Sequence, residues 1–236
     1  MILLDVDHVR KHYGRGSGGP LDDVSFVVEA GEMVVVWGER RSGRSTLLRV
    51  AAGIEAPDAG VVRFAGRDLA GRGREALGNG IAYCRKSFRP SAGQTVLDHL
   101  IAAQRARRIP PSTALPQTWK ALQRVSAEAC ATLRVAELNT EEIVRVAIAR
   151  ALTSSPRLLV IDEPTIGVGA PERDGILELL RSLSDDGIAI LASAGDGTGL
   201  MGADRVLSLD RGGLRGELSP NLAEVTDLER HRRASR

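Results

Sequence analysis

Cysteine is scarce in this sequence, and what is missing narrows the possible classes of protein. Cys84 and Cys130 form neither a CxxC pair nor a metal-ligand spacing, which argues against a disulfide scaffold and a cysteine metal site. An excess of one charge is also missing, because 32 basic and 30 acidic residues give a formal net charge of +2 and no indication of nucleic-acid binding. No apolar run approaches the roughly 20 residues that cross a bilayer, and Met1 to Asp5 shows no signal-peptide pattern. We therefore expect a soluble chain whose role at a membrane requires a partner.

The apolar residues that are present fall into short runs separated by helix-forming segments. With 236 residues, 43% of them hydrophobic, the chain is long enough for one large α/β domain. Residues 21–37 predict two β-strands joined by a glycine-containing turn, and residues 157–161 and 188–192 predict further buried strands. A helix is predicted between the last two, over 174–183. Continuous apolar strands that alternate with helices are typical of a parallel sheet covered on both faces.

The middle and the end of the chain differ from this pattern. Residues 87–152 contain no comparable strand and predict mostly helix. Within them, the proline-containing stretch 109–116 predicts a loop or linker. The basic tail, 221–236, is interpreted as a solvated end rather than a binding arm.

A glycine-punctuated loop follows the strand predicted to end at Trp37. Gly38 to Ser45 matches the phosphate-binding pattern GxxxxG[K/R]S, except that Arg44 stands where lysine is expected. Such a loop holds phosphate mainly with backbone N–H groups and the following helix N-terminus, for which Gly38 and Gly43 give the necessary torsions and close approach. The Ser45 hydroxyl is placed to bind Mg²⁺. A glycine-containing surface turn is the alternative from this pattern alone, and the GxGxxG dinucleotide fingerprint is absent.

Arg44 is the main departure in this loop. Lysine delivers a compact charge to the β- and γ-phosphates, whereas a guanidinium is longer, planar and favours bidentate contacts. We therefore expect nucleotide binding to be retained, with altered geometry at the γ-phosphate.

Two acidic residues follow the strand predicted over 157–161. Asp162 can hold Mg²⁺ directly or through water, and Glu163 can orient or deprotonate an attacking water. Adjacent carboxylates are common in ordinary loops, but after an apolar strand and downstream of a phosphate-binding loop they are much more specific. Glu163 is therefore the predicted catalytic residue.

Further segments stand in a definite order around these motifs: Ser45 to Gly53, Pro57 to Gly60, Arg145 to Leu152, Pro156 to Thr165 and Ala203 to Val206. Together they resemble the ABC ATPase family, in particular the small ATP-binding subunits of lipoprotein-release and MacB-type systems. The resemblance covers nearly all of the chain up to about residue 215. It implies an α/β P-loop NTPase fold, with a RecA-like parallel sheet core, an N-terminal antiparallel β part and an inserted helical subdomain.

Domain boundaries follow from the same resemblance. A single ABC ATP-binding domain is expected over 1–236, with 1–86 and 153–220 as the nucleotide-binding core. The helical subdomain is expected over 87–152, and the basic tail is expected at 221–236, after the second core segment.

The resemblance also implies which residues bind the cofactors, ATP and Mg²⁺. Tyr13 falls where the family places an aromatic ring against adenine, and such stacking needs no sequence code. Lys86 falls where the family has a glutamine that couples Mg²⁺ to transported cargo, and a lysine there could contact phosphate directly. The predicted nucleotide-binding residues are Tyr13, Gly38, Arg41, Ser42, Gly43, Arg44, Ser45, Thr46, Lys86 and Asp162, with Ser45 and Asp162 as metal ligands.

The sequence departs from the family where a residue reports on the γ-phosphate or completes a partner's site. Leu138 to Glu142 replaces the signature Leu-Ser-Gly-Gly-Gln/Glu, so that Thr140 and Glu141 stand in place of both glycines. Side chains there obstruct the approach of backbone to phosphate, and the Glu141 carboxylate opposes a polyphosphate. Gly195 replaces the γ-phosphate-sensing histidine, and Gly169 replaces an aspartate that contacts the partner subunit.

These departures predict a degenerate subunit that hydrolyses ATP weakly or not at all. A homodimer would contain two defective sites, so we expect a heterodimer with a conventional ABC ATPase subunit, docked on transmembrane permease subunits at the cytoplasmic face of the inner or plasma membrane. One alternative is an active ATPase in which Arg41 or Lys86 restores the charge that lysine supplies. The others are a soluble ABC protein of DNA repair or translation, which usually carries a coiled coil or a second cassette, and a scaffold that binds no nucleotide.

Overall fold

Two β-sheets and a layer of helices make up the computed structural model, which describes residues 1–14, 19–70, 77, 80–85 and 93–218. The strands are β1 (Ile2–Lys11), β2 (Leu21–Glu29), β3 (Met33–Trp37), β4 (Ala59–Phe64), β5 (Arg67–Asp68), β6 (Ile81–Cys84), β7 (Leu158–Ile161), β8 (Ala189–Ala194), β9 (Arg205–Asp210) and β10 (Gly213–Leu218). The helices are α1 (Arg44–Ala51), α3 (Val96–Arg105), α4 (Pro111–Arg124), α5 (Thr140–Leu152) and α6 (Ala170–Asp185), with 3-10 turns η1 (Glu128–Cys130), η2 (Val135–Glu137) and η3 (Gly197–Leu200).

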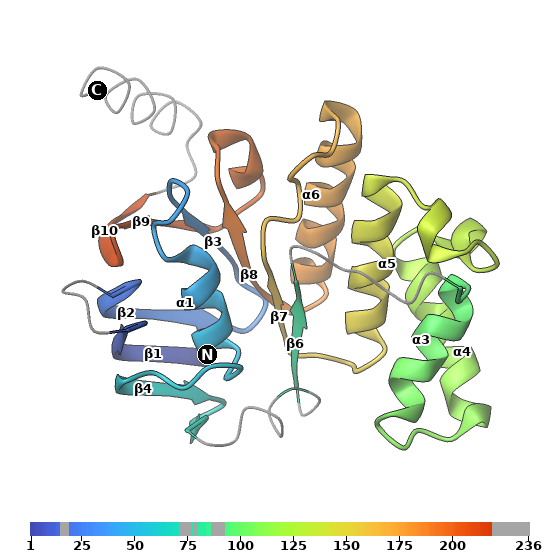
Figure 1. Ribbon diagram of the computed structural model, residues 1–236, viewed down its shortest axis with the longest axis horizontal. Coiled ribbons are helices and arrows are strands. Elements are labelled where there is room, and N and C mark those ends of the chain that lie inside the picture. The colour runs from blue at the N-terminus through green and yellow to red at the C-terminus, as the bar shows by residue number, and fades with distance from the viewer. Residues whose placement is uncertain (15–18, 71–76, 78–79, 86–92, 219–236) are drawn as a thin grey trace.

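The larger sheet places the predicted motifs along one edge. Its strand order is β10-β9-β3-β8-β7-β6, in which all neighbours from β9 to β6 are parallel and β10 is antiparallel to β9. The smaller, antiparallel sheet has the order β2-β1-β4-β5. Helix α1 lies between the two sheets, and α5 and α6 lie on the other face of the larger one (Figure 1). Because carboxyl ends of parallel strands share an edge, the segments after β3, β7 and β8 lie close together.

Strand β3 is buried on both faces, which explains its unbroken apolar sequence. Val34 and Val36 belong to a core shared with α1 and the antiparallel sheet. Met33, Val35 and Trp37 belong to a second core, shared with α5 and α6. The side chains alternate between the faces because successive residues of a strand point in opposite directions. The prediction of a parallel sheet covered on both faces is confirmed.

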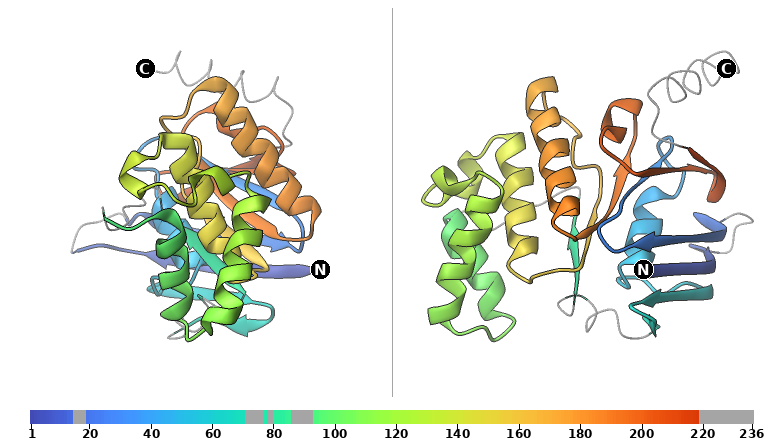
Figure 2. Two further views of the ribbon diagram at one scale, coloured as in Figure 1. Left: turned by 90° about the vertical axis from the view of Figure 1, so that its right-hand side faces the viewer. Right: turned by 180° about the vertical axis from the view of Figure 1, so that it is seen from behind.

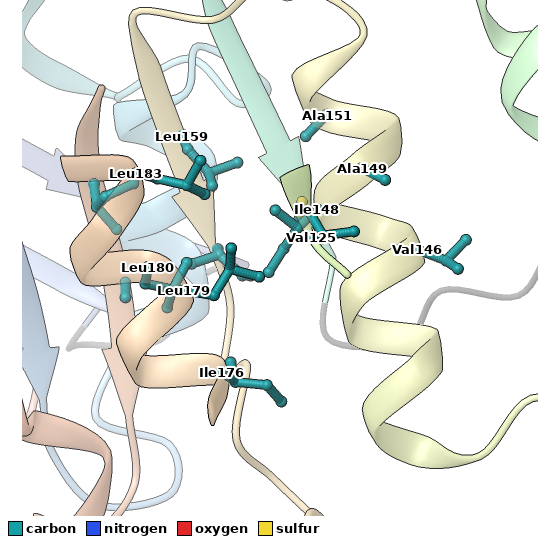
Figure 3. Packing of buried hydrophobic residues seen from close by; sticks show 14 of the residues in the cluster. Val125, Val146, Ile148, Ala149, Ala151, Leu159, Ile176, Leu179, Leu180 and Leu183 are labelled. Carbon is teal, nitrogen blue, oxygen red and sulfur yellow. The ribbon is translucent and has the colours of Figure 1, made fainter. Parts of the chain in front are cut away.

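Helix α6 covers the sheet through an apolar stripe. Its residues Ile176, Leu180 and Leu183 are each at most 1% exposed, and they belong to the same core as Leu159 of β7 and Ile148 of α5. Figure 3 shows these side chains gathered between α6, β7 and α5. Truncating one such leucine to alanine costs about 2–5 kcal/mol in other cores. This packing fixes the position of β7, which leads directly to Asp162.

The loop predicted over 109–116 is instead largely helical. Helix α4 begins at Pro111, where proline is favoured because the first helical N–H has no partner within the helix. Pro116 lies inside the helix and is tolerated there. Buried Gln104 on α3 donates hydrogen bonds to the Ala114 carbonyl (3.0 Å) and to Thr118 Oγ1 (2.7 Å), so side chains stabilise the turn around the proline. The prediction was wrong because tertiary contacts override the breaking tendency of proline.

The helices α3, α4 and α5 stand together at one end of the molecule, beside α6 (Figure 2). Among the described residues, no helix combines the length and apolar character that crossing a membrane requires. The predicted basic tail at 221–236 lies outside the described residues.

Candidate functional site

Close packing explains both glycines of the phosphate-binding loop. A side chain on Gly38 would place its Cβ 2.3 Å from the Leu209 carbonyl oxygen, and one on Gly43 would place it 2.0 Å from the Pro20 carbonyl oxygen. Gly43 also has φ of 108°, which side chains rarely adopt. The loop is therefore held against the end of β9 and the segment that precedes β2.

The N-terminus of α1 is open. Gly43 is its N-cap and gives no side-chain hydrogen bond, and the first turn contains no acidic residue. The Leu47 N–H donates to the Gly43 carbonyl at 2.9 Å, so the amides of residues 44–46 precede the first intrahelical bond. Unsatisfied amides and the positive end of the helix dipole attract anions. Within this turn Ser45 is half-buried and Thr46 is buried, while Arg41 is exposed in the preceding loop with φ of 67°.

Arg44 does not stand free in the loop but is paired with Glu163. Its Nη2 donates to Glu163 Oε1 at 2.6 Å, and the two side chains are 6% and 9% exposed. The sequence predicted Arg44 near phosphate and Glu163 near water, but not a bond between them. A charge-assisted hydrogen bond between buried groups is strong, so the predicted catalytic carboxylate is occupied by the loop's own arginine.

Ser193, which sequence reasoning did not assign to the site, holds the two acidic residues in place. Its Oγ donates to Asp162 Oδ1 at 2.7 Å and accepts from the Glu163 N–H at 3.0 Å. Glu163 has φ of 48°, an uncommon conformation for a residue with a side chain. Ser193 lies at the end of β8, so only the pairing of β7 with β8 brings it to these carboxylates. A hydroxyl at the end of the strand next to the acidic one is the signal that could have found it.

Tyr13 is held by a network that reaches helix α1. Its hydroxyl donates to Glu55 and accepts from Arg49 Nη2 at 3.1 Å, while Arg49 Nε donates to Glu55 Oε1 at 2.6 Å. Arg49 Nη2 also donates to Thr46 Oγ1 at 3.2 Å. Burial would raise the pKa of Glu55, but hydrogen bonds from Tyr13 and Arg49 and nearby positive charge lower it. Tyr13 remains 57% exposed, as a ring that stacks on a base must be.

Arg49 and Glu55 were not predicted to belong to the site. A basic residue on the first helix and an acidic one a turn beyond it carry no motif, so only the fold places them beside Tyr13. Lys86, the remaining predicted nucleotide contact, lies outside the described residues.

Gly195, which is predicted to replace a histidine, lies beside the Arg44–Glu163 pair. A Cβ on Gly195 would lie 3.2 Å from Arg44 Nη1 and 3.7 Å from Glu163 Oε1. A side chain at 195 would therefore crowd the guanidinium. Arg44, Glu163 and Gly195 thus lie close together, although they come from α1, the end of β7 and the end of β8.

The N-terminus of α5, where the signature is replaced, is closed by its own side chains. Asn139 accepts from the Glu142 N–H at 2.9 Å, and Glu142 accepts from the Asn139 N–H at 2.8 Å, which is a capping box. The Glu141 carboxylate accepts from Arg145 Nε at 2.6 Å. Arg145 therefore partly neutralises this carboxylate, while its opposition to a polyphosphate stays a prediction. The obstruction of a partner's phosphate by the side chains at 140 and 141 also stays a prediction.

Metal ligands in this region are few. Among the described residues, no group of three or more His, Cys, Asp or Glu side chains could hold a metal ion. Mg²⁺ usually keeps water ligands and binds through one or two protein oxygens together with substrate phosphates. The Ser45 hydroxyl and the Asp162 carboxylate fit this mode of Mg²⁺ binding, in which the substrate phosphates supply the remaining negative charge.

Comparison with known proteins identifies the family to which the chain belongs. A sequence model for the family described as "ABC transporter" matches residues 21–166. The dimeric structure of MJ0796, a bacterial ABC transporter cassette, superposes with a TM-score of 0.83 at 22% identity and covers 93% of this chain and 99% of that one. The ADP conformation of MJ1267, an ATP-binding cassette of an ABC transporter, gives 0.84 at 24% identity and covers 96% and 94%.

A third similar structure comes from a named transporter complex. The protein cbiO1 from Clostridium perfringens, part of the ABC transporter complex cbiONQ, gives a TM-score of 0.82 at 23% identity and covers 97% of this chain and 92% of that one. At these identities the structures establish the fold alone. The predicted α/β P-loop fold with parallel and antiparallel sheets is confirmed.

Proposed function

The chain belongs to the ABC transporter family, whose ATP-binding domain it forms, and we propose that it binds ATP with Mg²⁺ and couples dimer closure to a membrane permease while hydrolysing ATP weakly or not at all. The observation that carries this proposal is the buried Arg44–Glu163 ion pair beside the open N-terminus of α1. The open helix end supports binding, and the ion pair opposes catalysis.

Binding depends mainly on backbone groups that the substitutions leave intact. Gly38 and Gly43 keep the loop close to its neighbours, and the amides of residues 44–46 are available to phosphate. Tyr13 offers its ring to the base. The Ser45 hydroxyl and the Asp162 carboxylate would hold Mg²⁺, which neutralises phosphate charge when bound. Lys86 remains a proposed phosphate contact.

Catalysis needs a carboxylate that orients a water and accepts its proton. Glu163 is held at 2.6 Å by the guanidinium of Arg44, which keeps Oε1 engaged in a charge-assisted hydrogen bond. A water would have to compete with this bond. Slow or absent hydrolysis follows, although Glu163 itself is retained.

The same reasoning supports a heterodimer. In a homodimer, each site would combine the Arg44–Glu163 pair with the self-capped N-terminus of α5. A partner with a conventional signature would supply an open helix end to this chain's loop. The cbiO1 protein, which is part of a transporter complex, is a similar cassette. We accordingly place the chain at the cytoplasmic face of a membrane, bound to permease subunits and to a second ABC ATPase subunit.

The test separates binding from turnover. Equilibrium titration of the purified chain with a fluorescent ATP analogue is expected to show Mg²⁺-dependent binding, which Asp162→Asn weakens. Single-turnover measurement is expected to give a rate far below the roughly 1–100 s⁻¹ of phosphoryl-transfer enzymes. Glu163→Gln should then barely change the ATPase rate of the assembled transporter. Turnover at ordinary rates, abolished by Glu163→Gln, would favour the alternative of a fully active ATPase that uses arginine in place of lysine.

A further inference from the structure

The guanidinium of Arg44 uses only one of its two ends. Nη2 is bonded to Glu163, whereas Nη1, within the part of the chain that the structure describes, is buried and has no hydrogen-bond partner. The whole side chain is 6% exposed. A buried charged N–H group without an acceptor is costly, so it indicates that an acceptor arrives with a ligand.

Gly195 is what leaves room for this arrangement. Its backbone does not require glycine, since its φ lies outside the left-handed region where other residues are strained. A Cβ there would nevertheless lie 3.2 Å from Nη1 of Arg44, closer than ordinary van der Waals contact, and 3.4 Å from Nη2, at the lower limit of such contact. A side chain there would therefore require the guanidinium to shift by at least a few tenths of an ångström. The space at 195 and the arginine at 44 are therefore matched.

We propose that Arg44 is a bridge between nucleotide and Glu163: Nη2 holds the carboxylate, Nη1 donates to a phosphate oxygen of bound ATP, and Gly195 provides the space for both contacts. A planar guanidinium with divergent donors can serve two acceptors at once, which the single ammonium of lysine does less well. One arginine thus serves two roles. Its Nη1 makes the phosphate contact that lysine makes in the usual motif, and its Nη2 holds Glu163 beside Gly195. The inference rests on the proposed function, because it requires ATP in the phosphate-binding loop.

The first experiment measures the match between Arg44 and Gly195 without nucleotide. Melting midpoints are compared for the full chain and for Arg44→Lys, Gly195→His and the double variant. Gly195→His alone is expected to lower the midpoint by at least about 2–4 °C, and addition of Arg44→Lys to recover most of that loss. Gly216→His is the matched control, since a Cβ there meets nothing within 4 Å. Effects that simply add would overturn the matched pair.

The second experiment measures the bridge by equilibrium binding of a fluorescent ATP analogue. Arg44→Lys and Gly195→His are each expected to weaken binding by about tenfold, as for loss of one hydrogen bond to a charged group. The double variant should bind more tightly than the product of the single losses. Gly216→His is again the matched control, and its binding should stay within about twofold of the original chain. Additive losses, or no loss with Arg44→Lys, would overturn the bridge.

The two proposals fail in different ways. If the original chain takes up no ATP analogue, the proposed function fails, while the melting comparison still decides whether Arg44 and Gly195 are matched. If the chain binds the analogue and the Arg44 and Gly195 variants act independently, the bridge fails and the nucleotide-binding function stands.

Discussion

The N-termini of helices α1 and α5 differ in whether they leave backbone amides available to an anion. Helix α1 begins after Gly43 with no side-chain cap and no acidic residue in its first turn. Helix α5 begins with a capping box between Asn139 and Glu142, and its first turn contains two acidic residues. Acidic residues at a helix N-terminus stabilise the helix but use the same positive end that would attract a phosphate. Under the proposed function, the chain keeps the helix end that binds its own phosphate and closes the end that would serve a partner.

Each N-terminus also has an ion pair, and the two differ in burial. Arg44 and Glu163 are 6% and 9% exposed, whereas Arg145 and Glu141 are 17% and 23% exposed and lie one turn apart on one helix. Buried pairs are costly to break, because the remaining charge has no water to solvate it, while partly exposed pairs contribute little. Four substitutions, two at each helix end, test the contrast between the N-termini and between their ion pairs.

The largest effect is expected for Arg44→Ala. It leaves the Glu163 carboxylate buried without its cation, which costs about 3–5 kcal/mol of unfolding free energy in comparable cases. Urea unfolding of the nucleotide-free chain measures this loss. The double variant Arg44→Ala/Glu163→Ala should be more stable than the single one, because no buried charge is left. A loss below about 1 kcal/mol for Arg44→Ala would mean that the pair behaves like a surface pair.

Gly43→Glu should remove nucleotide binding. The new side chain would meet the Pro20 carbonyl oxygen, take on a strained φ, and place a negative charge at the open end of α1. We expect ATP-analogue affinity to fall by more than about a hundredfold, that is by about 2.7 kcal/mol or more. Gly216→Glu, at a position with open space around it, should bind normally. Equal binding by both variants would show that the end of α1 is not the phosphate site.

At α5, Asn139→Ala removes the cap and should cost about 1 kcal/mol of stability. The Glu142 amide would lose its acceptor, whereas Asn139→Ser keeps an oxygen at the same position and should cost much less. Thermal unfolding of the two variants side by side is the measurement. If both were as stable as the original chain, the capping box would not be closing this helix end.

Glu141→Gln is expected to have the smallest effect. It removes the charge that pairs with Arg145 one turn away, a contact worth about 0.3–0.5 kcal/mol on a helix surface. Unfolding in low and high salt checks the result, because the difference from the original chain should shrink as salt screens the pair. A loss as large as that of Arg44→Ala would abolish the contrast between the two ends.

Much of the fold follows from local patterns in the sequence. The unbroken apolar run Met33–Trp37 predicted a strand buried on both faces, and β3 divides its side chains between two cores. The strands predicted over 157–161 and 188–192 are present as Leu158–Ile161 and Ala189–Ala194. The stretch 109–116 was predicted as a loop because of its prolines. The hydrogen bond between Gln104 and Thr118, which stabilises the helix there, depends on the packing of α3 against α4 and could not be predicted from the local sequence.

The site was predictable as a set of positions but not as a set of bonds. The loop from Gly38 to Ser45 and the carboxylates at 162 and 163 carry motifs, so the sequence identified them. The bond between Arg44 and Glu163 joins residues 119 positions apart, and Gly195, from a third segment of the chain, lies beside it. Which side chains bond to each other across such distances depends on the tertiary structure, and the spacing of residues along the chain does not predict it.

The network around Tyr13 bears on the thermodynamics of base recognition. Arg49 and Glu55 fix the hydroxyl end of the ring during folding, before any ligand is present. The rotamer entropy that an unrestrained tyrosine would lose on stacking is therefore already lost, and preorganisation of this kind strengthens association without adding a contact. The tether engages the hydroxyl and not the ring face, so it leaves the choice among adenine, guanine and other flat bases to whatever else surrounds the nucleotide.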